Sequence, residues 1–89
     1  MSLAHAPEIV SVWTDGDRPA RLVWRGIRYL VTDDPEPLVQ DVVHDALTHP
    51  GTRVVGWRFQ ATSVVDGDAR VFDVHQVAGT RWQLTAVFV

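Results

Sequence analysis

Asp73 and His75 are the side chains in this sequence best placed for acid–base chemistry. They are two residues apart in a strand-like segment, so the carboxylate and the imidazole would share one face of a β-strand. Proton transfer also needs a pocket and a third group that orients the base. The sequence contains neither a G-x-S-x-G nucleophile turn nor a glycine-rich phosphate loop. We therefore expect a protein that is not an enzyme.

A second group of residues has the spacing of metal ligands. Asp41, His44 and Asp45 follow an i, i+3, i+4 pattern in a segment with helical periodicity, and His49 comes next. The same positions lie opposite an apolar stripe, where solvated polar side chains are expected in any case. The chain also has no cysteine, which excludes thiolate ligands and thiol nucleophiles. We expect no metal ion and no cofactor.

Arginines next to large aromatic residues form a third candidate site. The pattern occurs in "RLVWRGIRYLV" (21–31), "GWRFQ" (56–60) and "TRWQL" (80–84), and all eight basic residues are arginines in a chain of net charge −3. Because successive side chains of a strand point to opposite faces, the aromatics should pack inward and the arginines outward. The predicted interaction surface is this outward face together with the apolar last strand: Arg21, Arg25, Arg58, Gln60, Arg81, Gln83, Val87 and Val89.

Two kinds of partner suit such a surface. The first is a protein or a second copy of the chain, because Val87 and Val89 make both faces of the last strand apolar. The alternative is weak nucleic-acid binding, in which Arg25, Arg58 and Arg81 would contact phosphates. Proteins that bind single strands place aromatic and basic side chains on the same surface, and the alternation separates them here. We therefore favour a protein partner or a homodimer, with a small enzyme as a distant third hypothesis.

Strand patterns occupy most of the chain. Residues 8–13 alternate, "ARLVWR" and "IRYLVT" read as two strands joined at Gly26, and residues 52–65, 69–77 and 81–89 are rich in β-branched and aromatic residues. The Asp-Gly pairs at 15–16 and 66–67 are typical of hairpin turns, which explains the two "DGD" sequences better than calcium binding does.

One segment predicts an amphipathic helix. Apolar residues at 38, 39, 42, 43, 46 and 47 follow the spacing of a one-sided helix over residues 35–48. Asp34 would cap its N-terminus, Pro35 would occupy the first helical position, and Pro50 and Gly51 would end it.

These elements predict a single α+β domain. We expect a strongly bent antiparallel sheet of about six strands, in the form of a partial barrel, with the helix between strands 3 and 4. The domain would span residues 8–89, after a disordered or expression-derived leader at residues 1–7. The absence of cysteine, of a signal peptide and of a long apolar run predicts a cytoplasmic protein that does not associate with membranes.

The arginine–aromatic segments also resemble a family of small actinobacterial domains of unknown function. The resemblance lies in a W-R-G-x-R-Y hairpin, a central W-R strand and a final W-x-L-x-x-V-[FW] strand. Here these correspond to Trp24, Arg25, Gly26, Arg28, Tyr29, Trp57, Arg58, Trp82, Leu84, Val87 and Phe88. Some members are similar to segments of accessory proteins of error-prone DNA polymerases. The resemblance implies no catalytic residues and, at most, a role in a DNA transaction.

Overall fold

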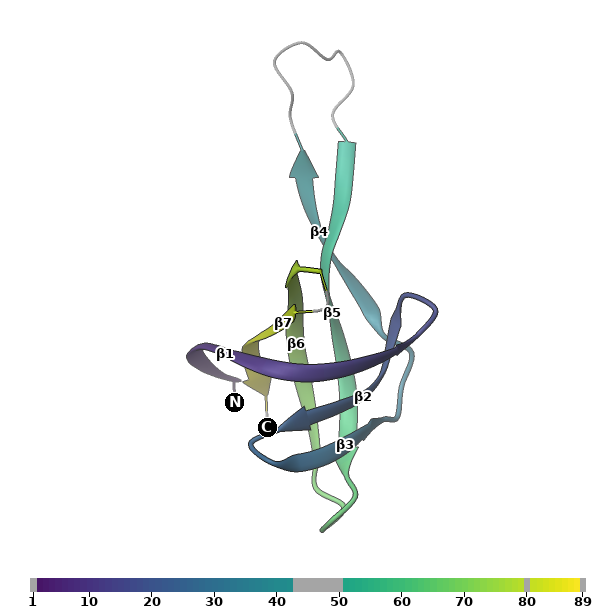
Figure 1. The fold of residues 1–89 in the computed structure, drawn as a ribbon, viewed down its shortest axis with the longest axis vertical. Helices are drawn as coiled ribbons and strands as arrows, with labels where there is room; N and C mark the ends of the chain where they lie inside the picture. Colours follow the sequence, from purple (N-terminus) through teal and green to yellow (C-terminus); the bar gives the residue numbers. More distant parts are fainter. Residues whose placement is uncertain (1, 43–50, 80, 89) are drawn as a thin grey trace.

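The computed structural model describes the backbone of residues 2–42, 51–79 and 81–88, and in this part of the chain the protein is all-β (Figure 1). Side chains are described for residues 8–40, 53–79 and 81–88. The strands are β1 (Ser2–Asp15), β2 (Arg18–Trp24), β3 (Ile27–Val31), β4 (Glu36–Val42), β5 (Gly51–Ser63), β6 (Ala69–Ala78) and β7 (Arg81–Phe88). The described residues include no helix that could cross a membrane.

The sheet closes into a barrel. Its strand order is β3-β2-β1-β7-β6-β5, every pairing is antiparallel, and β3 also pairs with β5, so six strands form a complete ring. The barrel is therefore closed, and the prediction of a partial barrel is wrong. Because β3 pairs with β5, each of the six strands has a neighbour on both sides over at least part of its length, which protects a small β protein from edge-to-edge association.

The remaining strand, β4, forms an arm that projects from the barrel. The β5 strand is 13 residues long. Its C-terminal part pairs with β3, through Val31 and Ala61 among others, while its N-terminal part pairs with β4, from Arg58 back to Gly51. In Figure 1, β4 and the first half of β5 rise together above the ring. The β3–β4 connection is fixed to β5, since the backbone amide of Gln60 donates a hydrogen bond to Asp33 Oδ1 at 2.8 Å.

The α+β fold class and the helix over residues 35–48 are wrong. Residues 36–42 form β4, and residues 43–50 lie outside the described residues. The register of β4 and β5 shifts between Leu38 and Val39, but the unpaired residue is Val55 of β5, so the alternation of β4 is not interrupted. The helical spacing depends on apolar residues at 38, 39 and 42 of β4 together with those at 43, 46 and 47, which lie outside the described residues. Val39 is 59 % exposed and pairs with Val54 on β5, so no buried helical stripe is formed. Asp34, the predicted cap, instead accepts a hydrogen bond from Arg18 at 2.6 Å.

The barrel interior contains the residues that alternation predicts for most strands. Leu22 and Trp24 of β2 and Trp57, Phe59 and Ala61 of β5 are buried, as expected. Phe72 lies at the centre of an aromatic cluster, with ring centroids 5.0 Å from Tyr29, 5.7 Å from Trp24 and 6.0 Å from Phe59. Edge-on and tilted arrangements at these distances stabilise a core beyond the area that they bury.

The last strand departs from strict alternation. The β6–β7 pairing shifts register between Asp73 and Val74, opposite Thr85. Trp82 and Leu84 point inward before this bulge and Val87 points inward after it, fully buried. The bulge therefore explains why both faces of this strand look apolar in the sequence.

The tight turns agree with the sequence. The β2–β3 hairpin turns at Arg25 and Gly26, whose φ angles are 52° and 78°, as a two-residue turn with left-handed residues requires. The two Asp-Gly sequences lie at the β1–β2 and β5–β6 turns. At the N-terminus, residues 2–4, which the sequence assigns to a leader, pair with β7.

Candidate functional site

Asp73 does not form an acid–base pair with His75 but an ion pair with Arg58. Arg58 Nε and Nη2 donate to the two carboxylate oxygens of Asp73 at 2.7 and 2.8 Å, in a bidentate arrangement. The two residues are directly opposite each other on β5 and β6, and Asp73 is only 8 % exposed. A buried carboxylate held by both its oxygens in this way orders the barrel wall.

The surroundings of Arg58 strengthen this structural role. Its guanidinium lies 5.0 Å from the Phe88 ring centroid, and Glu36 is its neighbour across β4 and β5. The hydrogen bonds that Arg58 donates to Asp73, followed by the negative charges of Asp73 and Glu36, raise the pKa of Arg58 above its usual value. We call the outer surface formed by Arg58, Asp73 and Phe88 the Arg58–Asp73 wall.

The other residues of the predicted interaction surface lie on several strands. Arg25 forms an ion pair with Glu8, in which Arg25 Nε donates to Oε1 at 3.3 Å and Arg25 Nη2 donates to Oε2 at 3.2 Å. Arg81 is exposed at the start of β7. The trio proposed for nucleic acid, Arg25, Arg58 and Arg81, thus comprises two ion-paired arginines and one at a strand end. Gln60 is exposed on β5, Gln83 is half-buried on β7, Val87 is in the core and Val89 lies outside the described residues.

Arg21, by contrast, contributes to a groove on the outer surface of β1, β2 and β3. Trp13 of β1 lies opposite Arg21 of β2, which lies opposite Leu30 of β3. The Arg21 guanidinium is 5.8 Å from the Trp13 ring centroid. Trp13 and Leu30 are each 47 % exposed. This row places an aromatic, a cationic and an aliphatic side chain side by side on the outside of the barrel.

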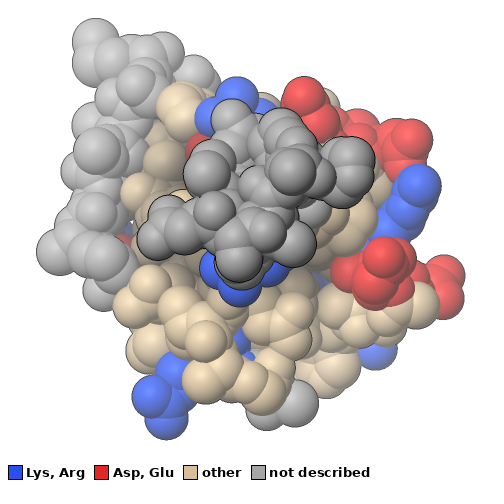
Figure 2. All heavy atoms as spheres, turned by 90° about the horizontal axis from the view of Figure 1, so that it is seen from above, with Lys and Arg blue, Asp and Glu red and all other residues tan. Residues whose placement is uncertain are grey.

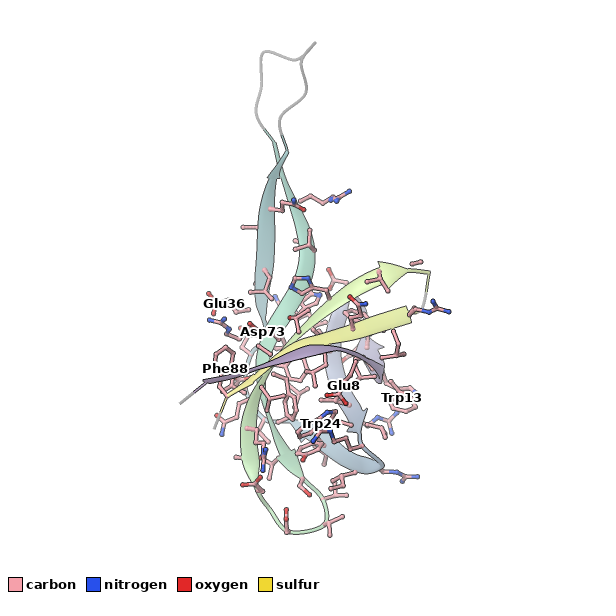
Figure 3. All side chains as sticks on the ribbon, turned by 90° about the vertical axis from the view of Figure 1, so that its left-hand side faces the viewer. Glu8, Trp13, Trp24, Glu36, Asp73 and Phe88 are labelled. Carbon is pink, nitrogen blue, oxygen red and sulfur yellow. The ribbon has the colours of Figure 1, made fainter. Side chains whose placement is uncertain are left out.

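A second row completes the groove. Val23 of β2 lies opposite Arg28 of β3, and Val64 donates its backbone amide to the Arg28 carbonyl at 3.0 Å. The cavity has a volume of about 540 Å³, and Val64 at its margin is 53 % exposed. We call this site, lined by Trp13, Arg21, Val23, Arg28, Leu30 and Val64, the Trp13 groove. In Figure 3 Trp13 lies on the opposite side of the barrel from Asp73 and Phe88.

The charges in and around the Trp13 groove have opposite signs. No described side chain forms an ion pair with Arg21 or Arg28. Acidic residues of the β1–β2 turn and the β3–β4 connection lie at one end of the groove, where Arg18 and Asp34 join the two segments at 2.6 Å. Figure 2 shows acidic side chains gathered on this side of the molecule. Asp66 and Asp68 follow Val64 in the β5–β6 turn at the other end. Arg21 and Arg28 thus line the groove without an ionic partner among the described residues, and two of the nearby carboxylates, Asp34 and Asp68, are themselves paired with arginines.

Sequence reasoning missed Trp13, Arg28, Leu30 and Val64. Trp13 was missed because the sequence does not show which face of β1 is buried. In the structure Val10 and Val12 face the core, while Ile9 and Trp13 face outward. Hydrophobicity alone favours the opposite choice, because Ile and Trp bury more apolar area than two valines. The signal that was present is the β3 alternation, in which Tyr29 faces inward and therefore Arg28 and Leu30 face outward.

The predicted metal ligands fall largely outside the part of the chain that the structure describes. Asp41 lies on β4, whereas His44, Asp45 and His49 are outside the described residues. Across the described residues, no group of three or more histidine or acidic side chains is arranged to hold a metal ion.

Comparison of the chain with protein-family models, with curated proteins and with solved structures found no match. The resemblance to small actinobacterial domains therefore remains a prediction from the arginine–aromatic motifs. Of these motif residues, Trp24, Tyr29, Trp57, Trp82, Leu84 and Val87 are part of the core.

Proposed function

We propose that this protein is a small non-enzymatic interaction domain that binds an acidic segment of a partner protein in the Trp13 groove. The observation that carries the proposal is a tryptophan that is 47 % exposed beside two arginines, Arg21 and Arg28, to which no described carboxylate is bound. Tryptophan and arginine are the residues most enriched where a few contacts supply most of the binding energy between proteins.

Binding would recover free energy that the isolated domain leaves unused. Covering the exposed part of the Trp13 ring removes roughly 100 Å² of mostly apolar surface from water, which is worth about 2–3 kcal/mol. Val23, Leu30 and Val64 extend this apolar surface around the ring. An aliphatic or aromatic side chain of the partner fits between them.

The arginines define the charge of the partner. Guanidinium groups bind carboxylates in a bidentate manner, and Arg21 and Arg28 are adjacent to the apolar lining of the groove. A segment with one apolar anchor between acidic residues would satisfy both features. A nucleic-acid strand fits less well, because its continuous negative charge would pass the carboxylates of the β1–β2 turn and of the β5–β6 turn.

The burial of Val87 bears on self-association. The two-sided apolar character of the last strand is the reason to expect a homodimer from the sequence, and Val87 is fully buried in the barrel core. We therefore place the partner in the Trp13 groove and favour a different protein over a second copy. The absence of cysteine suits a reducing compartment, and we infer that the domain acts in the cytoplasm.

The test uses short synthetic peptides in which leucine, phenylalanine or tryptophan is flanked by glutamates, and matched peptides with glutamine instead. Binding is followed by ¹H–¹⁵N NMR, in which the protein's four tryptophan indoles give separate reporters. We expect the acidic peptides to shift the Trp13 indole and the Arg28 and Leu30 amides, and to bind more weakly at high salt. Trp13→Ala should weaken binding by roughly tenfold or more.

Two variants serve as controls. Ile9→Ala truncates another exposed side chain of β1 that does not line the groove, and Arg18→Ala removes an arginine already paired with Asp34. Both should bind the peptides as the wild type does. If no acidic peptide perturbs the groove, or if oligothymidylate binds through Trp13 more tightly than every peptide, the proposal is wrong. Concentration-dependent sedimentation that Trp13→Ala abolishes would identify a second copy as the occupant instead.

A further inference from the structure

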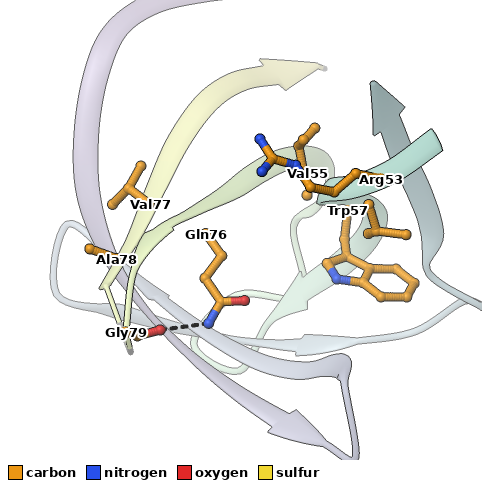
Figure 4. A pocket seen from close by; sticks show the side chains of 9 residues that line it. Arg53, Val55, Trp57, Gln76, Val77, Ala78 and Gly79 are labelled. Atoms are coloured by element: carbon orange, nitrogen blue, oxygen red, sulfur yellow. Dashed lines mark hydrogen bonds between the residues drawn. The ribbon is translucent and has the colours of Figure 1, made fainter. Parts of the chain in front are cut away.

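A second cleft opens where β5 and β6 separate. Their pairing begins where Thr62 lies opposite Ala69 and ends where Gly56 lies opposite His75. Beyond this point β5 continues into the arm with β4, while β6 turns back into β7. The cleft between them has a volume of about 310 Å³ and is lined by residues 53–57 of β5 and 76–79 of β6 and the following turn (Figure 4).

Gly56 marks the point of separation. A Cβ atom at this position would overlap the backbone carbonyl of Val74 and approach His75 Cδ2 to 2.7 Å. The two strands are therefore in direct backbone contact at Gly56 and diverge after it. A glycine is what permits such a close approach of two backbones.

Each side of the cleft is a strand with one unpaired edge. In β5, Arg53 and Val54 pair with Gln40 and Val39 of β4. In β6, residues 76 and 78 pair with Trp82 and Arg81 of β7. No strand of the described chain pairs with the edges of residues 53–55 and 76–78 that face each other. Unpaired strand edges offer alternating N–H and C=O groups at the spacing of a β-ladder.

We propose that this cleft binds an extended peptide segment of a partner protein by β-strand addition. Main-chain hydrogen bonds to β5 or β6 would supply the affinity, and alternate side chains of the peptide would point into the cleft. Val55 and the buried Trp57 provide an apolar surface for one such side chain (Figure 4). Arg53 is exposed at the margin, and no described side chain forms an ion pair with it, so it would bind a carboxylate of the segment.

The geometry favours a peptide over other occupants. A volume of about 310 Å³ is at the lower limit for a pocket that encloses a small molecule. An extended chain can instead pass through the cleft and continue beyond both ends. Only a polypeptide backbone also presents the donor and acceptor spacing that two strand edges require. The site does not depend on the Trp13 groove, since the two share no lining residue.

The test begins with a phage-displayed library of random peptides selected on the wild-type protein. Counter-selection uses Ala78→Trp, which fills the cleft from an exposed position, and the matched control Val65→Trp places the same side chain in the exposed β5–β6 turn. A selected peptide is then synthesised and examined by amide hydrogen exchange of the protein. We expect slower exchange at residues 53–55 and 76–78, loss of binding in Ala78→Trp, and unchanged binding in Val65→Trp and Trp13→Ala.

N-methylation of the peptide distinguishes strand addition from side-chain docking. Methylation of alternate backbone nitrogens on the paired edge should weaken binding by about tenfold per lost hydrogen bond, while methylation of the intervening nitrogens should not. Three results would overturn the proposal: no enriched peptide that protects these amides, equal tolerance of both methylation patterns, or protection of the same amides by self-association alone. Loss of binding in Trp13→Ala would assign the peptide to the groove instead.

Discussion

The barrel carries arginines on two opposite walls, and the two walls differ in what faces each guanidinium. On the Arg58–Asp73 wall the guanidinium is bound by the carboxylate of Asp73, a residue that is 8 % exposed, and lies 5.0 Å from the Phe88 ring centroid. In the Trp13 groove, Arg21 faces an exposed indole, and no described carboxylate pairs with it. In Figure 3 the two sites lie on opposite sides of the barrel.

The comparison shows that a shared residue pattern leads to two different roles. Arg58 and Arg21 both alternate with buried aromatic or aliphatic neighbours in their strands. The partner supplied by the adjacent strand makes the difference: Asp73 is opposite Arg58, whereas Trp13 and Leu30 are opposite Arg21. An arginine with an internal carboxylate stabilises the fold, whereas we propose that an arginine without one binds the partner.

The largest expected effect tests how closely β5 and β6, the strands that carry Arg58 and Asp73, approach each other. Gly56→Val places a side chain against the Val74 carbonyl on β6, so the two backbones must separate. Because backbone cannot yield as a flexible side chain does, we expect the free energy of unfolding to fall by more than about 3 kcal/mol. Urea denaturation followed by tryptophan fluorescence measures the change.

The control for this substitution lies on β1, outside the lining of the Trp13 groove. Ser11→Val also adds a branched side chain to a small residue, but Ser11 is exposed on the outer surface of β1. It should change the free energy of unfolding by less than about 0.5 kcal/mol. A Gly56→Val protein within about 1 kcal/mol of the wild type would show that β5 and β6 do not cross so closely.

The second prediction compares the arginines of the two walls directly. Arg58→Ala leaves the Asp73 carboxylate nearly buried and without its two charge-assisted hydrogen bonds. Removing one partner of a buried ion pair lowers the free energy of unfolding by roughly 3–5 kcal/mol. Because the Arg58 side chain is 46 % exposed, we expect a smaller loss of about 2 kcal/mol. Arg28→Ala should cost less than about 0.5 kcal/mol, since it removes an exposed side chain that has no described ionic partner.

Thermal and urea unfolding of the two variants provide the measurement, with Arg70→Ala as a control for an arginine in a more exposed pair. Arg70 binds Asp68, whose side chain is 47 % exposed. Arg70→Ala should therefore lower the free energy of unfolding by less than Arg58→Ala and by more than Arg28→Ala. Equal losses for Arg58→Ala and Arg28→Ala would remove the distinction between the two walls.

The sequence predicts the inner faces of β2 and β5 correctly because strict alternation holds there. Leu22, Trp24, Trp57 and Phe59 are buried as expected. It fails at β7, where the bulge at Thr85, opposite Asp73 and Val74, moves Val87 into the core. It fails at β4 for another reason: the consecutive apolar residues Leu38 and Val39 begin a helical spacing, although Val39 is exposed on a strand. A bulge has no required residue type in such segments, so periodicity alone cannot locate it.

The candidate site was less predictable than the fold. Arg21 was expected on an outer face, and the structure places it there. Its neighbours Trp13 and Leu30 are brought to it by strand register, which depends on long-range pairing of β1, β2 and β3. The bidentate pair of Arg58 and Asp73 depends in the same way on the register of β5 and β6. Both roles follow from which strands meet, and local sequence does not determine that.

The smallest expected effect concerns Asp66 in the β5–β6 turn, where backbone groups rather than an arginine hold the carboxylate. The amide of Asp68 donates to Asp66 Oδ1 at 3.0 Å, and this bond, followed by a hydrogen bond from the Ser63 hydroxyl, lowers the pKa of Asp66. Folding therefore favours the ionised form. The stabilisation is complete above the unfolded value of about 3.9 and is lost as the pH falls through the lower folded pKa.

A ¹³C NMR titration of the Asp66 carboxyl should place its midpoint below this ordinary value, and Ser63→Ala should move it only part of the way back, because the stronger bond from Asp68 remains. Asp66→Asn keeps an acceptor for the Asp68 amide but removes the charge, so its deficit in melting temperature relative to the wild type should shrink as the pH falls. A midpoint at or above the ordinary value would contradict the backbone contact.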